Sequence, residues 1–460
     1  VIQNDISLEA GQTITVPAGS MATLDLNGHT ISVAEDYEGW AIVNYGTLTI
    51  TGDGTIDVSG SFDGYGSVRN YGNLEIINGT YTGKTEAGHY ASENGYQIGG
   101  QIRNEDAGYL VIYDGTFKGT PRALHNLGAA FVNGGTFSGD SCSSCTFTGK
   151  DGEEIKSYYT YTIGNNSANS YMVFNNGTVT GIQGGISGAY GYIEINGGNF
   201  STHRCDNNHQ PFHACYIAGD SGEVAGAING GNFYSSDRYA LWVGNNMEGD
   251  GGERENASVV VTGGVFKTGS ATNSPMLVDV GVGVATVAGG SFFNNASSVD
   301  APGTPCTKVN INGGSTSSTD LSTCFPADTE VQIDPATGQV THAHIISDVC
   351  TGDETGHWHT CKYCDEKMDS TVAHNYGDSV LFEIDDVTYS ARECVDCGYI
   401  HYEVYEIPTT PGYDDDEDLL PFIPTQPKDS GDDVTIVACA AAAVVAALMA
   451  VFLIVSYKKD

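Results

Sequence analysis

The chain has few basic residues. Lys and Arg number 18 against 57 Asp and Glu, which gives a formal net charge of -39 at pH 7. A surface of this sign repels nucleic acid and anionic lipid headgroups. We therefore exclude nucleic-acid binding as a function of this chain.

Helical periodicity is also lacking, and charged residues make up only 16% of the chain. No segment repeats its apolar residues with the spacing of an amphipathic helix, so strand–helix–strand units are excluded. Glycine is abundant, with 61 residues of 460. This composition is typical of turn-rich β-structure and not of a disordered chain.

A short repeated phrase runs through the first three hundred residues instead. Residues 74–81 (LEIINGTY) and 193–200 (IEINGGNF) are two copies, and apolar and polar residues alternate in each, as in a strand. The aliphatic positions align as Leu26, Ile50, Ile76, Ile112, Val132, Phe174, Ile195, Ile228, Val261, Val287 and Ile311. A second column follows the turn: Ile31, Ile56, Tyr81, Phe117, Phe137, Val179, Phe200, Phe233, Phe266 and Phe292.

The residues between the two columns are mostly Asn and Gly, which supply the left-handed backbone of a sharp corner. A second strand phrase precedes several copies, and we expect its Asn44, Asn70 and Asn126 to stack as an internal ladder. Self-similarity of this kind marks an array whose units bury apolar surface against their neighbours. We predict an all-β fold in which residues 1–335 form a single-stranded parallel β-helix of about eleven coils. A β-sandwich of hairpins would not repeat the same corner residues.

The C-terminal part of the sequence predicts a membrane anchor. Residues 406–433 form an acidic, Pro-rich linker, and an uncharged run from Val434 to Ser456 can cross a hydrocarbon core of about 30 Å. We predict a transmembrane helix at 434–457 and a cytoplasmic tail at 458–460, because Lys458 and Lys459 favour the cytoplasmic side. A buried soluble helix is the alternative. The N-terminal part would then lie outside the cell, on a single-pass protein at the cell surface.

Residues 340–405 form a small Cys/His module with two CxxC pairs, Cys361 with Cys364 and Cys394 with Cys397. Tetrahedral zinc takes four Cys or His ligands. Either all four cysteines hold one structural zinc ion, or Cys361, Cys364 and His374 with an upstream His hold one ion, and Cys394 and Cys397 with a further His hold a second. Disulfides are the competing state outside a cell. Nothing indicates an open, catalytic coordination position.

One outward slot of the predicted β-helix holds cations in consecutive coils: Arg69, Arg103 and His125. Such a column can bind the carboxylate of an acidic sugar or supply the base of an elimination. The alternative is that these cations are only neutralised by nearby acids, namely Asp63, Glu105 and Asp106. In the outward slot before the aliphatic column, no two adjacent coils carry carboxylates, as the pair in a glycosidase requires.

Two segments resemble known families. Residues 356–364 (GHWHTCKYC), followed by 373–376 and 394–399, resemble the Cys/His repeats near the C-termini of Firmicutes surface proteins. Residues 23–31 (TLDLNGHTI) resemble the opening coil of the right-handed, pectate-lyase-like β-helix repeat proteins of the same bacteria. These resemblances imply a right-handed coil and a zinc-ribbon-like module at the cell surface. The β-helix group includes polysaccharide lyases, hydrolases and adhesins, so the resemblance implies no single activity.

We therefore expect a cell-surface anchored adhesin or binding rod of a Gram-positive bacterium. Its expected partner is an extracellular glycan or a surface protein of the host or of a bacterium. The 26 tyrosines of the chain suit sugar stacking or protein contact wherever they are exposed. The alternative is an extracellular polysaccharide lyase or glycoside hydrolase on the same scaffold. The lack of paired carboxylates favours the binding protein over the enzyme.

Overall fold

The computed structural model describes most of the chain up to residue 405. The described residues are 1–35, 37–61, 65–83, 101–119, 122–139, 146–148, 154–156, 161–182, 184–188, 191–205, 208, 213–218, 224–244, 257–278, 283–305, 308–311, 318–320, 331–333, 340–342, 344–362, 366–384 and 387–405. They form strands and turns and include no helix. The fold is therefore all-β, as the sequence predicts.

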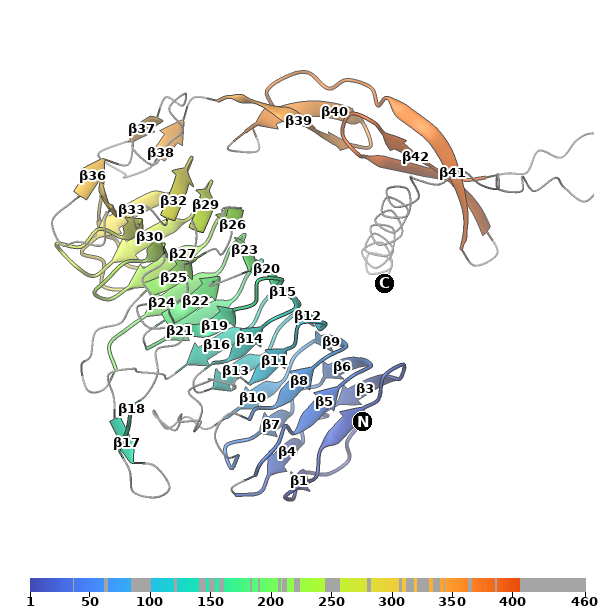
Figure 1. The fold of residues 1–460 in the computed structure, drawn as a ribbon, viewed down its shortest axis with the longest axis vertical. Helices are drawn as coiled ribbons and strands as arrows, with labels where there is room; N and C mark the ends of the chain where they lie inside the picture. The colour runs from blue at the N-terminus through green and yellow to red at the C-terminus, as the bar shows by residue number, and fades with distance from the viewer. Residues whose placement is uncertain are drawn as a thin grey trace, which may run out of the picture. The chain divides into compact units, whose positions relative to one another are not determined.

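Three long sheets, here called A, B and C, make up most of the described structure (Figure 1). Sheet A consists, in order, of β1 (Ile6–Leu8), β4 (Thr30–Val33), β7 (Thr55–Asp57), β10 (Thr80–Thr82), β13 (Thr116–Gly119), β16 (Thr136–Gly139), β21 (Thr178–Gly181), β24 (Asn199–Thr202), β27 (Asn232–Ser235), β30 (Val265–Thr268), β33 (Ser291–Asn294) and β34 (Thr304–Pro305). Sheet B consists of β2 (Ile14–Val16), β5 (Ile42–Asn44), β8 (Val68–Asn70), β11 (Ile102–Asn104), β14 (Leu124–Asn126), β19 (Tyr161–Asn165), β22 (Gly184–Gly188), β25 (His213–Ile217), β28 (Leu241–Val243), β31 (Met276–Val278), β35 (Lys308–Ile311) and β36 (Ser318–Asp320). Sheet C consists of β3 (Met21–Asp25), β6 (Thr47–Thr51), β9 (Asn73–Ile76), β12 (Tyr109–Ile112), β15 (Ala129–Val132), β20 (Tyr171–Phe174), β23 (Tyr192–Ile195), β26 (Val224–Ile228), β29 (Ala257–Val261) and β32 (Gly283–Val287).

Consecutive strands of the chain belong to sheets A, B and C in turn, and we call one passage of the chain through all three sheets a coil. Neighbouring strands of a sheet come from successive coils and pair in parallel, for example β1 with β4, β2 with β5 and β3 with β6. The last partners, β34 and β36, are antiparallel to their neighbours. This arrangement is consistent with a parallel β-helix. The number of coils stays a prediction, because parts of the chain beyond residue 305 lie outside the described residues.

The second predicted column is confirmed along its whole length. Ile31 pairs with Ile56, Tyr81 with Phe117, and the ladder continues in register to Phe266 and Phe292. These side chains point into the core, where most of the rings stack face to face. Tyr81 and Phe117, for example, have ring centroids 4.8 Å apart. Burying such a ring contributes about 1.5–3 kcal/mol, so each coil is held mainly by its neighbours.

The first column is correct from Ile50 to Val287 and wrong at its two ends. Ile50 pairs with Leu24 and not with Leu26, because the first corner is longer and Leu26 lies buried inside it. Ile311 belongs to sheet B, where its partner is Val278. The repeated sequence shows that a residue belongs to the array, but the length of each corner determines which strand contains that residue.

The predicted left-handed corner is also confirmed. Between sheets C and A, successive coils carry glycine at positive φ, including Gly231 at 102° and Gly264 at 101°. A Cβ atom at Gly264 would lie 3.3 Å from the carbonyl oxygen of Gly231 and from the ring of Phe266. The positive φ and this tight contact together favour glycine at these corners, which explains the recurring glycine of the repeat.

The predicted asparagine ladder forms at the corner between sheets B and C. Its members are fully buried: Asn44, Asn70, Asn104, Asn126 and Asn165. Each Nδ2 from Asn44 to Asn126 donates to the Oδ1 of the next asparagine over 2.7–2.8 Å. The same amides also donate to backbone carbonyls of the next coil. The ladder therefore satisfies buried polar groups of the corner and holds the coils in register.

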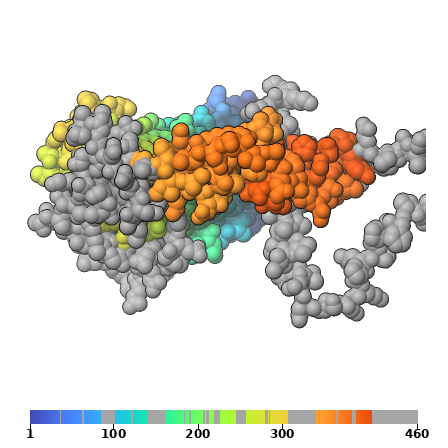
Figure 2. Space-filling model, turned by 90° about the horizontal axis from the view of Figure 1, so that it is seen from above, coloured from blue at the N-terminus to red at the C-terminus, as the bar shows by residue number. Residues whose placement is uncertain are grey.

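Four smaller sheets complete the described structure. Their strands are β17 (Thr146–Thr148), β18 (Glu154–Lys156), β37 (Val331–Ile333), β38 (Val340–His342), β39 (Ile346–Asp353), β40 (Gly356–Cys361), β41 (Tyr376–Ile384), β42 (Val387–Cys394) and β43 (Ile400–Val404). Contacts divide the chain into one unit of Val1–Ser379 with Ala391–His401 and a second unit of Val380–Ser390 with Tyr402–Asp460. The hairpin of β39 and β40 belongs to the first unit, and Figure 2 shows its outer surface in orange.

The predicted acidic linker, membrane span and cytoplasmic tail, residues 406–460, lie outside the described residues. Within the part of the chain that the structure describes, no helix has the length and apolar character needed to cross a membrane.

Candidate metal centre and candidate ligand surface

Four potential metal ligands converge in the Cys/His module. His357, His374, Cys394 and Cys397, here called the tetrad, bring one ligand atom each to within 4.8 Å of one another. Cys394 Sγ lies 3.6 Å from His357 Nδ1, and Cys397 Sγ lies 3.5 Å from His374 Nδ1. A tetrahedral zinc site with ordinary Zn–S and Zn–N distances separates such atoms by about 3.6 Å. The donor set and its geometry therefore fit zinc.

The groups around the tetrad orient its ligands. Nε2 of His374 donates to the carbonyl of Asp353 over 2.5 Å, which leaves Nδ1 as the ligand atom. Nε2 of His357 lies 4.0 Å from the carboxylate of Asp396. The hydrogen bond of His374 fixes the orientation of its ring and makes its imidazole a better ligand, whereas Asp396 is too far from His357 for a hydrogen bond. The tetrad therefore resembles a closed, structural site more than a catalytic one.

The electrostatics of Cys394 suit a metal ligand. Burial raises the pKa of this thiol, but the backbone amides of Asp396 and Cys397 and the ring of His374 lower it to about 6. The pKa of Cys397 is raised by burial and by the neighbouring sulfur of Cys394. Cys394 and Cys397 are both free thiols in the structure, so they are not joined in a disulfide.

The structure places His374 differently from the second predicted pairing, and the pairing of all four cysteines stays a prediction. His374 lies with Cys394 and Cys397, whereas Cys361 lies with His342 and His344 in a second group. Cys364 lies outside the described residues. Strand pairing explains the difference, because β42 ends at Cys394 and its turn faces His374, while Cys361 ends β40 and pairs with Ile346.

A third Cys–His contact resembles part of a catalytic triad. Cys350 Sγ lies 3.2 Å from Nε2 of His359, and Nδ1 of His359 lies 2.6 Å from Oδ2 of Asp369. Loss of solvation raises the pKa of Cys350, and the carboxylates of Asp396 and Asp369 raise it further. The thiol therefore stays protonated at neutral pH, and we assign it no nucleophilic role.

The predicted cation column forms on sheet B. Arg69, Arg103 and His125 are in register on β8, β11 and β14. Glu105 bridges the two arginines, since its Oε1 lies 2.6 Å from the Nε atom of each. Burial raises the pKa of Glu105, but its contacts with Arg103 and Arg69 lower it overall. The neutralising role that the sequence suggested for Glu105 is therefore present, and Asp63 lies outside the described residues.

His125 is the least accessible member of this column. It is buried, and its Nδ1 accepts a hydrogen bond from Nη1 of Arg103 over 3.1 Å. Burial and the charges of Arg122 and Arg103 lower the pKa of His125 well below its ordinary value. The ring is therefore neutral at pH 7, and the Nδ1 lone pair is already engaged. Arg69 is the more exposed arginine, and its guanidinium lies 5.0 Å from the ring of Tyr71.

An aromatic strip crosses the outer face of sheet C. Tyr109, Phe131, Tyr171 and Tyr192 come from four successive strands of that sheet, β12, β15, β20 and β23. Ring centroids lie 5.6 Å apart from Tyr109 to Phe131, 6.1 Å from Phe131 to Tyr171 and 5.3 Å from Tyr171 to Tyr192. Tyr109 is 44% exposed and Tyr171 39%, so ligands can reach these rings.

Small and acidic residues surround the strip. Ala129 separates Tyr109 from Tyr171 in the same outward column, and Glu75 and Glu194 lie in the next column on either side. Burial raises the pKa of Tyr171, and Glu194 raises it further, so the phenol remains a hydrogen-bond donor at neutral pH. Phe131 lies in the slot next to the aliphatic column, and the tyrosines lie two residues earlier in the sequence. The recurrence of tyrosine in that earlier slot is the signal in the sequence that points to the strip.

Comparison of the chain with protein-family models, with curated proteins and with solved structures found no match. The tetrad, the cation column and the aromatic strip are therefore interpreted from their own geometry.

Proposed function

We propose that this chain is a glycan-binding adhesin at the surface of a Gram-positive bacterium, and that the aromatic strip of sheet C is its binding surface. The observation that carries this proposal is the row of accessible rings on Tyr109, Phe131, Tyr171 and Tyr192. A soluble protein rarely exposes adjacent large rings without a partner. Sheet C holds them on rigid, fully paired strands, which lowers the entropy cost of binding.

The chemistry of the strip suits a sugar better than a hydrophobic protein segment. One face of a pyranose ring carries C–H groups that pack on an aromatic ring, while its hydroxyl groups project at the edges. Glu194 and the phenol groups of Tyr171 and Tyr192 are placed to accept and donate hydrogen bonds at those edges. Repeated rings along the coils would bind successive units of one polysaccharide chain.

The cation column would extend this surface toward acidic sugars. Arg69 is partly exposed, and the ring of Tyr71 beneath it stacks on Tyr45 with centroids 4.9 Å apart. A uronate carboxylate could pair with Arg69 while its ring contacts these tyrosines. Arg69 would then be the residue that contacts the sugar, and Arg103 and His125 would support it from the neighbouring coils.

The rest of the proposal concerns architecture and attachment. The scaffold would be a right-handed, pectate-lyase-like β-helix, and the tetrad would hold one structural zinc ion. This ion would close a module too small to fold on a hydrophobic core alone. Residues 434–457 would anchor the protein in the membrane, with the N-terminal part extracellular.

A glycan panel tests the proposed function. The full chain is incubated with neutral and acidic polysaccharides, and retention and cleavage are both measured. We expect retention without cleavage, and we expect Tyr171→Ala to weaken it about tenfold, or about 1.4 kcal/mol. Tyr65→Ala removes another exposed tyrosine outside the strip and serves as the control. Arg69→Gln should weaken the retention of acidic glycans and leave the retention of neutral glycans unchanged.

Other results would overturn this assignment. New unsaturated or reducing chain ends would identify the alternative, a polysaccharide lyase or glycoside hydrolase. Retention that is equal in Tyr171→Ala and in the parent would show that the strip is not the binding surface. If no glycan is retained while a cell-surface protein is, the strip is a protein-binding surface instead.

A further inference from the structure

The segment that follows β37 is fastened to the last described coil of sheets C and A. The backbone N–H of Val340 donates to the carbonyl of Gly290 over 3.0 Å, and the side chain of Val340 is buried in the β-helix core. Nδ1 of His342 lies 2.6 Å from the carbonyl oxygen of Ala288. A carbonyl only accepts, so Nδ1 carries the proton and Nε2 of the neutral ring presents a lone pair.

That lone pair faces a cysteine from a different hairpin. Nε2 of His342 lies 3.3 Å from Sγ of Cys361, and the ring of His344 lies beside that of His342 with centroids 5.1 Å apart. His342, His344 and Cys361 bring one ligand atom each to within 4.8 Å of one another. The carbonyl of Ala288 is the kind of outer partner that orients a ligating histidine.

Hydrophobic packing brings the thiol to the same place. Cys361 is buried and packs with Ala288, and Ile345 and Met368 cover this contact. Cys361 also pairs with Ile346 across the β39–β40 hairpin, which places the strand end beside His344. The three ligands thus come from two segments that meet at the end of the β-helix.

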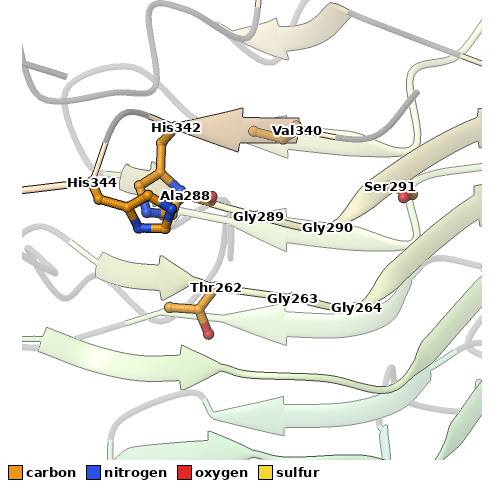
Figure 3. Close-up of a pocket in the computed structure, with 10 residues that line it drawn as sticks. All are labelled: Thr262, Gly263, Gly264, Ala288, Gly289, Gly290, Ser291, Val340, His342 and His344. Atoms are coloured by element: carbon orange, nitrogen blue, oxygen red, sulfur yellow. Dashed lines mark hydrogen bonds between the residues drawn. The ribbon is translucent and has the colours of Figure 1, made fainter. Parts of the chain in front are cut away.

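A cavity of about 390 Å³ opens beside the two histidines. Its other walls are glycines together with Thr262, Ala288, Ser291 and Val340 (Figure 3). The close-up shows both imidazole rings next to Ala288. Cys361 does not line this cavity, so the cavity provides space on the histidine side of the three ligands for a further donor, such as water.

We propose that His342, His344 and Cys361 form a second metal site, which binds a zinc-class divalent ion independently of the tetrad. The two imidazoles and one thiolate are borderline-soft donors, the set that zinc prefers. Because His342 is attached to Ala288 and Cys361 ends β40, the bound ion joins the β39–β40 hairpin to the end of the β-helix. The site acts as a metal clip and is separate from the proposed glycan surface.

The number of bound ions tests the clip. The full chain is stripped of metal under reducing conditions and titrated with Co²⁺, whose absorption spectrum reports tetrahedral geometry and thiolate ligation. We expect two equivalents in the parent and one in a His342→Gln, His344→Gln double variant. Glutamine at position 342 can still donate to Ala288, which separates metal binding from the hydrogen bond. His29→Gln, which changes a histidine outside both groups, should retain two equivalents.

A second variant distinguishes the two sites. Cys394→Ser with Cys397→Ser removes the tetrad and should also retain one equivalent, with the weaker charge-transfer band of a single thiolate. If this variant binds no metal, the clip is not a site of its own, and the proposal is wrong. If the parent binds one equivalent and the His342, His344 variant also binds one, the clip is again refuted while the tetrad survives.

Hydrogen exchange tests the joining role. The amides of Val340 and Cys361 donate to Gly290 and Glu366, respectively. In the parent, Zn²⁺ should slow the exchange of both amides at least tenfold. In the His342, His344 variant, Zn²⁺ should leave the rate of Val340 unchanged, whereas the rate of Cys361 can still fall because His357 of the tetrad lies on the same strand, β40. Equal protection of Val340 in the parent and in this variant would show that the ion does not join the hairpin to the β-helix.

Discussion

Replacing Asn104 with alanine should destabilise the β-helix far more than replacing a surface asparagine of similar connectivity. Asn104 is fully buried, and its Oδ1 accepts from Nδ2 of Asn70 over 2.7 Å. The two hydrogens of its Nδ2 are shared among Oδ1 of Asn126, 2.8 Å away, and the carbonyl oxygens of Gly108 and Ala129, 3.0 Å away each. The substitution removes all of these hydrogen bonds from a region without solvent.

The magnitude follows from the number of lost hydrogen bonds. A buried hydrogen bond contributes about 0.5–1.5 kcal/mol, and an unsatisfied buried partner adds a desolvation penalty. Asn104→Ala should therefore lower the free energy of unfolding by about 4 kcal/mol. With a urea m-value of about 3 kcal/mol/M, the unfolding midpoint should fall by about 1 M.

The chain contains a matched control on its surface. Asn175 also forms amide-to-amide hydrogen bonds with the coils on either side, to Asn133 over 2.8 Å and from Asn196 over 2.9 Å. These side chains are exposed, so water can replace both bonds. Asn175→Ala should therefore cost no more than about 0.5 kcal/mol.

Urea unfolding of both full-length variants, followed by far-UV circular dichroism, is the assay. Solenoid coils are coupled mainly to their nearest neighbours, so the transition that includes sheets A, B and C is the one to compare. Equal midpoint shifts for Asn104→Ala and Asn175→Ala would refute the argument, because burial would then make no difference. A shift below about 0.3 M for Asn104→Ala would refute it as well.

Three further predictions concern other parts of the molecule. Contacts with Arg103 and Arg69 hold the pKa of Glu105 below its ordinary value of 4.5. The ionised carboxylate therefore contributes its full stabilisation above pH 4.5, and this stabilisation is lost as the pH falls through the folded-state pKa. Glu105→Gln should lower stability at pH 7 by about 2 kcal/mol, and acid melts should show a smaller further loss between pH 5 and 3 than in the parent. Phe233→Ala, in a fully buried ring stacked 4.7 Å from Phe200 and 4.9 Å from Phe266, should cost about 3–5 kcal/mol in urea unfolding; a cost below 1 kcal/mol would contradict its place in the core. A zinc chelator should increase proteolysis around the tetrad while far-UV circular dichroism of the sheets stays constant, and unchanged proteolysis would argue against a metal-held module.

The repeated phrase predicts much of the fold because each part of it has a local physical cause. Alternating apolar residues specify strands with one buried face, and glycine at the corner specifies a left-handed backbone that other residues rarely adopt. Identical phrases in successive coils then stack in register. The column from Ile31 to Phe292 and the buried asparagines could both be predicted for this reason.

The ends of the array could not be predicted in the same way. The first corner is longer than the others, which shifts the pairing of Ile50 from Leu26 to Leu24. The repeat around Ile311 matches the sequence of the sheet C strands, but Ile311 pairs with Val278 in sheet B. Sequence similarity shows that a residue belongs to a repeat, whereas the path of the backbone around each corner decides its partner.

The candidate sites depended still more on the tertiary structure. The sequence alone determined that cysteines and histidines of metal-ligand type are concentrated after residue 340, and that cations recur in consecutive coils. Only the folded chain placed His374 with Cys394 and Cys397, and Cys361 with His342, because pairing between strands brings together residues that are distant in sequence. Only the parallel register of sheet C brings Tyr109, Phe131, Tyr171 and Tyr192 together in one strip. Side chains that are neighbours on this surface come from adjacent coils and not from adjacent positions in the sequence.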